Sequence, residues 1–263
     1  MIYLKKIVHK KKTVANHYPY NIPAIQTMDQ LDISQPITFF IGDNGSGKTT
    51  LLETLVCMTK TVNLIDEDKN TMSGPRKLAK DFDLVWQQKS FRGFYLKAQS
   101  FIYFIKQLDL MKREANQALE DLKDQYADRS PYAYTLAKGP YIKTLHALET
   151  RYEKSLSKLS HGQAYLELFK SRLVPGGLYI LDEPELSLSP HRQLSLMALI
   201  KDMIKKDCQF IIITHSPILM ALDQSTIYSF DDHIIRALKY QDVPHVQLTR
   251  DFLNHPEAYL KHL

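Results

Sequence analysis

The sequence predicts an α/β fold with a mainly parallel core sheet, and three observations support this prediction. Short apolar runs have the length and composition of strands buried on both faces, at residues 37–41, 178–181 and 210–213. Helical periodicity follows the first run and separates the other two, at residues 49–60 and about 192–204. A glycine-rich turn joins the first strand to the first helix. Because strands and helices alternate, we expect helices to cover a parallel sheet.

Two regions depart from this alternation. Residues 2–8 alternate as a strand and predict an N-terminal antiparallel β region. Residues 101–152 carry helical spacing and predict a helical subdomain, too short for a long coiled coil. We expect one domain over residues 1–263, with a core lobe of residues 1–98 and 157–263 and a helical subdomain of residues 99–156.

The composition is typical of a globular protein, with 44% apolar and 24% charged residues. Apolar runs stay far below the roughly 18 residues of a membrane-crossing helix, so we expect no direct membrane insertion. The first residues lack the layout of a secretion signal, and Cys57 and Cys208 are expected as core thiols. Together these features predict a cytoplasmic protein.

The net charge is +5, and five lysines gather near the N-terminus at positions 5, 6, 10, 11 and 12. Such a cluster could bind nucleic acid or an acidic membrane surface. We favour a solvated edge hairpin, because aromatic residues do not alternate with these lysines. The charge alone does not establish nucleic acid as a partner and does not exclude it. The ten histidines have no paired spacing, so we expect no zinc site.

Residues 42–49 read Gly-Asp-Asn-Gly-Ser-Gly-Lys-Thr and form a phosphate-binding loop between a strand and a helix. Its backbone N–H groups and the helix N-terminus are suited to phosphate. We expect Lys48 to reach the β- and γ-phosphate oxygens of ATP and the Thr49 hydroxyl to ligate Mg²⁺. The residues expected to contact the nucleotide are Gly42, Asn44, Gly45, Ser46, Gly47, Lys48, Thr49 and Thr50.

Two strand ends supply candidate catalytic groups. Asp182 follows the buried run at residues 178–181, where its carboxylate can hold Mg²⁺. Glu183 comes one residue later and is the expected general base for the attacking water, although acidic pairs also cap helices. His215 follows the run at residues 210–213 and is expected to hydrogen-bond the γ-phosphate, although a lone histidine there is often structural.

The sequence also predicts two further site residues, each with alternatives. Gln99 stands where the sheet gives way to the helical insertion, from which a glutamine can reach Mg²⁺ and the water; Gln87 and Gln88 are the alternatives. Tyr20 is the expected adenine-stacking residue, with Tyr18 as an equal alternative, and both could instead be packing residues.

The pentapeptide Leu159-Ser160-His161-Gly162-Gln163 narrows the mechanism. Ser160, Gly162 and Gln163 open a predicted helix, and the N–H groups of a helix N-terminus bind anions. Within one subunit this site points away from the subunit's own phosphate loop, so it needs a γ-phosphate from another subunit. We therefore expect an ATP-dependent homodimer, paired head to tail around two nucleotides.

These motifs resemble the soluble ATP-binding cassette (ABC) ATPases of the SMC, RecF and OLD branch, and most of all a group of small bacterial predicted ATPases of AAA-family or ABC-like type. The resemblance spans nearly the whole chain, at residues 18–21, 42–50, 93–101, 159–163, 181–190, 248–253 and 256–257. Glu185 fits this soluble branch better than it fits transporter subunits. His161 replaces the usual glycine, and no Toprim nuclease domain fits after His215, so nuclease activity is not implied.

The resemblance implies a P-loop NTPase of ABC type that uses Mg²⁺ to convert ATP to ADP and phosphate. Its ATP-driven dimerisation would act on an unidentified partner. The alternative is the ATP-binding subunit of an ABC membrane transporter, with a membrane protein as partner. A nucleotide-gated scaffold that barely turns over ATP is a third interpretation, which the intact Lys48, Asp182, Glu183 and His215 disfavour.

Overall fold

The computed structural model describes residues 1–13, 15–64, 72–126, 130–151 and 160–261. It divides into two compact units, Met1–Ala98 with Leu173–Leu263, and Gln99–Arg172, which we describe separately. The second unit ends at Arg172 and not at the predicted residue 156. The reason is that the ring of Tyr165 lies edge-on to the ring of Phe101 at 5.1 Å, which joins the helix after residue 160 to the helical unit.

A seven-stranded sheet forms the centre of the first unit, in the order β10-β9-β3-β8-β7-β6-β4. Every neighbouring pair is parallel except β10 and β9. The strands are β3 (Ile37–Ile41), β4 (Val62–Asn63), β6 (Phe94–Lys97), β7 (Leu178–Asp182), β8 (Gln209–Ile213), β9 (Ser225–Ser229) and β10 (Arg236–Leu238). β3, β7 and β8 are buried at every residue, which agrees with their continuous apolar sequences. The predicted mainly parallel α/β fold is confirmed.

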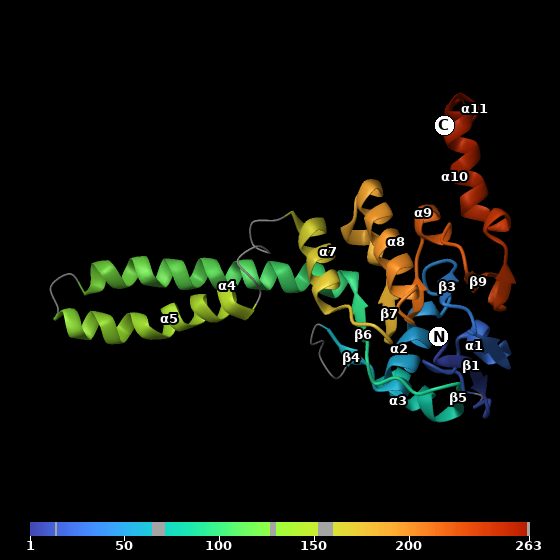
Figure 1. Cartoon of the computed structure of the whole chain (residues 1–263), viewed down its shortest axis with the longest axis horizontal. Helices are drawn as coiled ribbons and strands as arrows, with labels where there is room; N and C mark the ends of the chain where they lie inside the picture. Colours follow the sequence, from blue (N-terminus) through green and yellow to red (C-terminus); the bar gives the residue numbers. More distant parts are fainter. Residues whose placement is uncertain (14, 65–71, 127–129, 152–159, 262–263) are drawn as a thin grey trace. The chain divides into compact units, whose positions relative to one another are not determined.

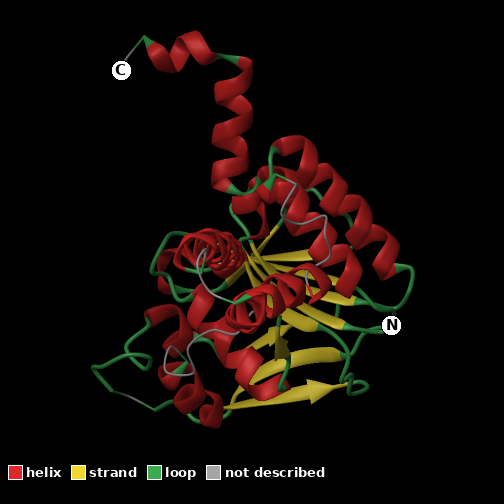
Figure 2. Cartoon of the chain, turned by 90° about the vertical axis from the view of Figure 1, so that its left-hand side faces the viewer, coloured by secondary structure: helices red, strands yellow, loops and turns green. Residues whose placement is uncertain are grey.

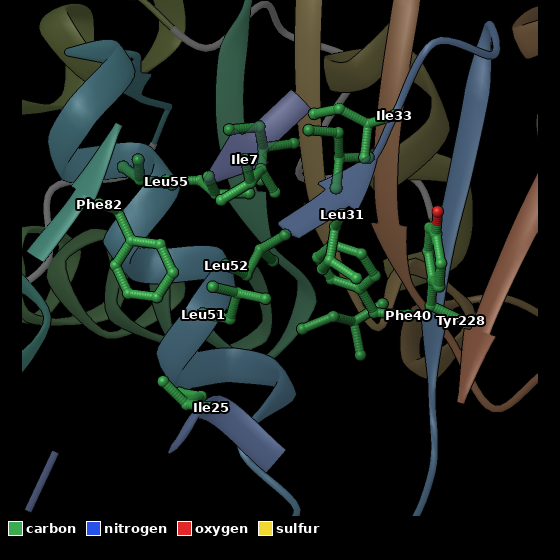
Figure 3. Close-up of a cluster of buried hydrophobic side chains, with 14 of the residues drawn as sticks. Ile7, Ile25, Leu31, Ile33, Phe40, Leu51, Leu52, Leu55, Phe82 and Tyr228 are labelled. Carbon is green, nitrogen blue, oxygen red and sulfur yellow. The ribbon is translucent and has the colours of Figure 1, made fainter. Parts of the chain in front are cut away.

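A smaller antiparallel sheet, in the order β2-β1-β5, makes up the predicted N-terminal β region. Its strands are β1 (Leu4–His9), β2 (Gln30–Asp32) and β5 (Phe82–Trp86). Figure 3 shows its buried residues, Ile7, Leu31 and Phe82, packed against Leu51, Leu52 and Leu55 of the helix that follows β3. This shared core fixes the helix between the two sheets.

Helices of the first unit connect and cover the strands (Figures 1 and 2). They are α1 (Pro23–Thr27), α2 (Lys48–Thr59), α3 (Ser73–Leu78), α8 (Pro190–Ile204), α9 (Pro217–Met220), α10 (Pro244–Asn254) and α11 (Pro256–Leu260). Short 3₁₀ turns occur at η1 (Ala79–Asp81), η2 (Pro184–Ser187), η3 (Asp231–His233) and η4 (Tyr240–Asp242). In both views α10 and α11 stand away from the rest of this unit.

The helical unit consists of α4 (Ala98–Gln125), α5 (Pro131–Arg151) and α7 (His161–Arg172). α4 and α5 lie side by side in Figure 1, and the rings of Tyr126 and Tyr134 meet at 6.4 Å across them. Among the residues with described positions, no helix is long and apolar enough to cross a membrane.

One buried amide joins the two sheets. Gln209, on β8, is fully buried, and its Oε1 accepts hydrogen bonds from the backbone N–H groups of Tyr3 at 3.0 Å and Leu4 at 2.9 Å. Its Nε2 donates to the carbonyls of Leu4 at 2.8 Å and Ile33 at 2.7 Å. The side chain therefore satisfies four backbone groups that the sheet ladders leave unpaired.

We expect Gln209→Leu to lower the free energy of unfolding by about 3 kcal/mol or more, because it leaves these four buried backbone groups without hydrogen-bond partners. Urea unfolding followed by circular dichroism measures the change. Gln30→Leu, on an exposed position of β2, makes the same replacement without that loss and should shift the midpoint little. Equal shifts in the two variants would contradict the role of Gln209.

Candidate active site

The phosphate-binding loop runs from β3 into α2, and its glycines take backbone angles that other residues avoid. Gly42, Gly45 and Gly47 have φ values of 130°, 84° and 104°. A Cβ on Gly47 would also lie 2.5 Å from Cγ2 of Ile22, so space as well as φ requires glycine there. The loop leads directly into the N-terminus of α2, the arrangement that binds phosphate in other proteins.

Lys48 is the first residue of α2 and is 5% exposed. Its Nζ donates to the carbonyl oxygens of Gly42 at 2.6 Å and Asp43 at 2.8 Å. Burial lowers the pKa of Lys48, and the charges of nearby carboxylates, with Glu183 first, oppose that shift. The ammonium group is thus held inside the loop by weak carbonyl partners, which phosphate oxygens can replace with charge-assisted bonds.

Asp182 ends β7 and fits the metal role predicted for it. The residue is 2% exposed; Oδ2 accepts a 3.5 Å hydrogen bond from Tyr95 Oη, and Oδ1 is buried with no partner among the described residues. Burial raises the pKa of Asp182 to about 7, against the lowering effect of Lys97. Because a partnerless buried carboxylate oxygen is costly, a divalent cation there would stabilise the carboxylate. Thr49, half-buried in the first turn of α2, supplies a hydroxyl of the kind Mg²⁺ accepts beside phosphate.

Glu183 and His215 come together at the ends of neighbouring strands. Glu183 takes a left-handed conformation with φ 50°, and its Oε1 lies 3.7 Å from His215 Nε2. The backbone N–H of His215 donates to Glu185 Oε1 at 2.5 Å, so Glu185 fixes the chain at the histidine. Both side chains of the pair are partly exposed, at 32% for Glu183 and 42% for His215. They are therefore accessible to a ligand.

A cleft of about 490 Å³ opens beside this pair. Its walls include Asn44 of the phosphate loop, Glu183, Glu185 and His215. One predicted residue of the phosphate loop thus shares a cavity with the predicted general base and the predicted histidine.

Asp231 is a site residue that motif reasoning missed. Its Oδ1 accepts from the backbone N–H of Asp43 at 2.9 Å, and its Oδ2 accepts from Ser229 Oγ at 2.6 Å. A Cβ on Gly42 would lie 2.8 Å from Asp231 Oδ1, so the carboxylate occupies the space beside the loop. Asp231 follows β9, which pairs with β3, but 188 positions separate it from Asp43. No local sequence signal reveals the contact.

Lys97 and Glu53 have no predicted role in the site. They form an ion pair of 3.6 Å with side chains 26% and 10% exposed. Lys97 ends β6 opposite Asp182 of β7. The pair therefore supplies both a positive and a negative charge that act on Asp182.

The residues of the pentapeptide lie in the helical unit, and Leu159 lies outside the described residues. Ser160 precedes α7 and is exposed. Its backbone N–H and its hydroxyl both donate to Gln163 Oε1, at 3.1 and 3.2 Å, which is half of a capping box. Ser160 and Gln163 are exposed and Gly162 is buried at the start of α7. The binding of an anion by these residues stays a prediction.

Gln99 and the two tyrosines predicted from the sequence lie in different parts of the structure. Gln99 is exposed at the start of α4, the second residue after β6. Tyr20 lines a cavity of about 150 Å³ with His9 and Ile25, and no residue of the phosphate loop lines that cavity. Tyr18 instead contacts α2, with its Oη 3.4 Å from Thr50 Oγ1. Gln99 and Tyr20 stay predictions.

The lysine cluster near the N-terminus is partly neutralised. Lys10 Nζ lies 2.9 Å from Asp83, and Lys12 Nζ lies 2.5 Å from Asp29. These exposed ion pairs agree with a solvated sheet edge.

Comparison with known proteins assigns the chain to a family. Residues 60–221 match the family described as AAA domain, putative AbiEii toxin, Type IV TA system. The macrolide export ATP-binding/permease protein MacB of Photorhabdus laumondii is 25% identical over 228 residues, which are 85% of this chain and 33% of that protein. MacB of Escherichia coli K12 is 25% identical over 233 residues, which are 86% of this chain and 33% of that protein. The chain thus spans about a third of the length of these relatives.

The fold has a counterpart among solved structures. The structure of cbiO1 from Clostridium perfringens, part of the ABC transporter complex cbiONQ, matches this chain with a TM-score of 0.50 and 16% sequence identity. The match covers 100% of each chain. The fold and the motif residues define an ABC-type P-loop ATPase. The chain belongs to the AAA-domain family that its residues 60–221 match.

We expect Asp231→Ala to raise the KM for ATP about 10-fold while kcat stays within about 2-fold, because the amide of Asp43 loses its acceptor and the loop its shape. Steady-state ATPase assays measure both constants. Asp231→Asn keeps an acceptor oxygen and should lie close to the wild type. Asp242→Ala, at an exposed aspartate, is the matched control. A KM unchanged in Asp231→Ala would contradict the role of the carboxylate.

Proposed function

We propose that this ATPase works as a switch that pairs head to tail with a second copy when ATP is bound and separates after hydrolysis. One observation carries the catalytic part of the proposal. Glu183 and His215 lie 3.7 Å apart in a cleft that also includes Asn44 of the phosphate loop. A carboxylate and a histidine beside the phosphate loop are the groups needed to orient water and hold the γ-phosphate.

The roles of the residues follow from their positions. When bound, Mg²⁺ would neutralise charge on the β- and γ-phosphate oxygens, and Thr49 and Asp182 would hold it. Lys48 exchanges its two carbonyl partners for phosphate oxygens. Glu183, at the mouth of the cleft, orients the attacking water and takes its proton. His215 donates to the γ-phosphate from the nitrogen that faces Glu183.

Pairing is the part of the proposal that rests on Ser160, Gly162 and Gln163. The N-terminus of α7 offers backbone N–H donors and an exposed serine hydroxyl. These donors suit a phosphate, and the phosphate loop of the same chain belongs to the other compact unit. A γ-phosphate held by a second copy would complete both sites at once, which gives a closed two-fold pair. Hydrolysis then removes the shared ligand.

A second candidate function is the ATP-binding subunit of a membrane transporter. The observation that favours it is the match of 85% of the chain to a third of MacB, a protein named for both ATP binding and a permease. In that case a membrane protein is the partner. Nucleic acid is a further candidate partner for the switch, for which the partly neutralised lysine cluster gives weak support.

We expect Glu183→Gln to bind ATP as the wild type does but to lose at least about 99% of its turnover, because the amide cannot accept the proton of water. Mass measurement in solution, with and without Mg-ATP, should show a shift from monomer to dimer that persists in this variant. Glu257→Gln, an exposed position on α11, should hydrolyse normally. Normal turnover in Glu183→Gln would refute the assignment of the base.

Ser160→Arg should leave ATP binding intact and abolish the mass shift, because the long cation blocks the exposed start of α7. Ser171→Arg places the same side chain at the exposed far end of α7 and should pair normally. The test combines nucleotide affinity with the mass measurement, in the Glu183→Gln background. Pairing that survives Ser160→Arg would exclude the proposed interface.

A further inference from the structure

His245 lies in the first turn of α10 and has no role in the motifs. Its Nε2 is buried and has no hydrogen-bond partner among the described residues. The start of α10 is firmly held, because Val243 and Val246 are 0% and 2% exposed. A desolvated ring nitrogen on a fixed backbone is costly unless another state of the protein supplies its partner.

The surroundings of His245 connect it to the catalytic cleft. Tyr240 Oη, in the turn before α10, donates to the carbonyl of Pro217 at 3.0 Å, and α9 starts at Pro217, two residues after His215. Burial lowers the pKa of the His245 imidazole, the charge of His215 lowers it further, and Asp231 opposes both. The Tyr240 bond and the packing of α10 against α9 place the first turn of α10 near the chain that follows His215. A neutral imidazole at His245 has one N–H to donate.

His215, which follows β8, needs a hydrogen-bond donor as a partner for its ring. His215 Nε2 faces Glu183 Oε1 at 3.7 Å and, in the proposed function, donates to the γ-phosphate. A neutral imidazole that donates from Nε2 has an unprotonated Nδ1, which must accept a hydrogen bond. The backbone N–H of His215 is already bonded to Glu185, so the ring is the part that can reorient.

We propose that His245 is a positioning residue for His215: with nucleotide bound, His245 Nε2–H donates to His215 Nδ1 and keeps the His215 proton on Nε2. This inference rests on the proposed function. It assigns α10 a place in the ATPase cycle, because the residue that orients His215 belongs to the first turn of that helix. Figures 1 and 2 show that the same helix leads away from the body of its unit, toward α11.

Three variants test the proposal by activity. His245→Leu removes the donor and should lower kcat about 10-fold or more, while the KM for ATP stays within about 2-fold. His245→Gln keeps an N–H donor near the position of Nε2 and should recover most of the lost kcat. His255→Leu, at an exposed histidine at the end of α10, should behave as the wild type. Wild-type kcat in His245→Leu, or no recovery in His245→Gln, would overturn the proposal.

A spectroscopic measurement tests it without turnover. Long-range ¹H–¹⁵N spectra of the imidazoles, recorded with Mg²⁺ and a non-hydrolysable ATP analogue, distinguish the two neutral tautomers. The His215 signals are assigned by their loss in His215→Gln. We expect the Nε2–H form of His215 in the wild type and a mixture of tautomers in His245→Leu. The same tautomer in both proteins would overturn the proposal.

Failure of this inference and failure of the proposed function give different results. If Glu183→Gln loses turnover and His245→Leu does not, only the role of His245 is wrong. If Glu183→Gln keeps turnover, the proposed catalytic mechanism itself is wrong.

Discussion

The parallel register of three buried strands is the constraint on which the site depends. Phe40 of β3 and Asp182 of β7 both pair with Ile213 of β8, so the three strands end at the same level of the sheet. The phosphate loop after β3, Glu183 after β7 and His215 after β8 therefore meet at one edge. Both faces of these strands are buried, so a shift by one residue would exchange the side chains of two packed faces and disturb the packing of both.

The site contains buried polar atoms that have no hydrogen-bond partner among the described residues. Among the described residues, the partnerless buried side-chain atoms include Ser46 Oγ, Asp182 Oδ1, Glu185 Oε2 and His245 Nε2. Buried polar groups in stable proteins are nearly always paired, so the partnerless atoms in the phosphate loop and at the end of β7 indicate groups arranged for a ligand. The balance of charge supports this interpretation, because the charges of several carboxylates act on the ammonium group of Lys48. A divalent cation with a nucleotide supplies both the positive charge and the acceptors that are absent.

Sequence reasoning predicted the strands and the loops that follow them where the signal is local. The phosphate loop and the acidic pair after β7 occupy short continuous segments, and the apolar runs beside them specify buried strands. It failed for Gln209 and Asp231, which act on backbone groups about 200 positions away in sequence. The boundary of the helical unit was misplaced for the same reason, since the ring contact of Tyr165 with Phe101 joins segments that no periodicity connects. In the sequence His245 is one of ten scattered histidines, and only the fold shows that its helix packs against α9, which begins two residues after His215.

The capping bonds of α7 bear on how tightly two copies can hold each other. The hydroxyl hydrogen of Ser160 is already used in a bond to Gln163. To donate to a phosphate on another molecule, Ser160 must first give up that internal bond, so each association exchanges one hydrogen bond for another and gains only the difference. In the proposed pair, such an exchange would keep the complex weak enough to separate quickly. The local stability of one helix end would then set the lifetime of the assembly.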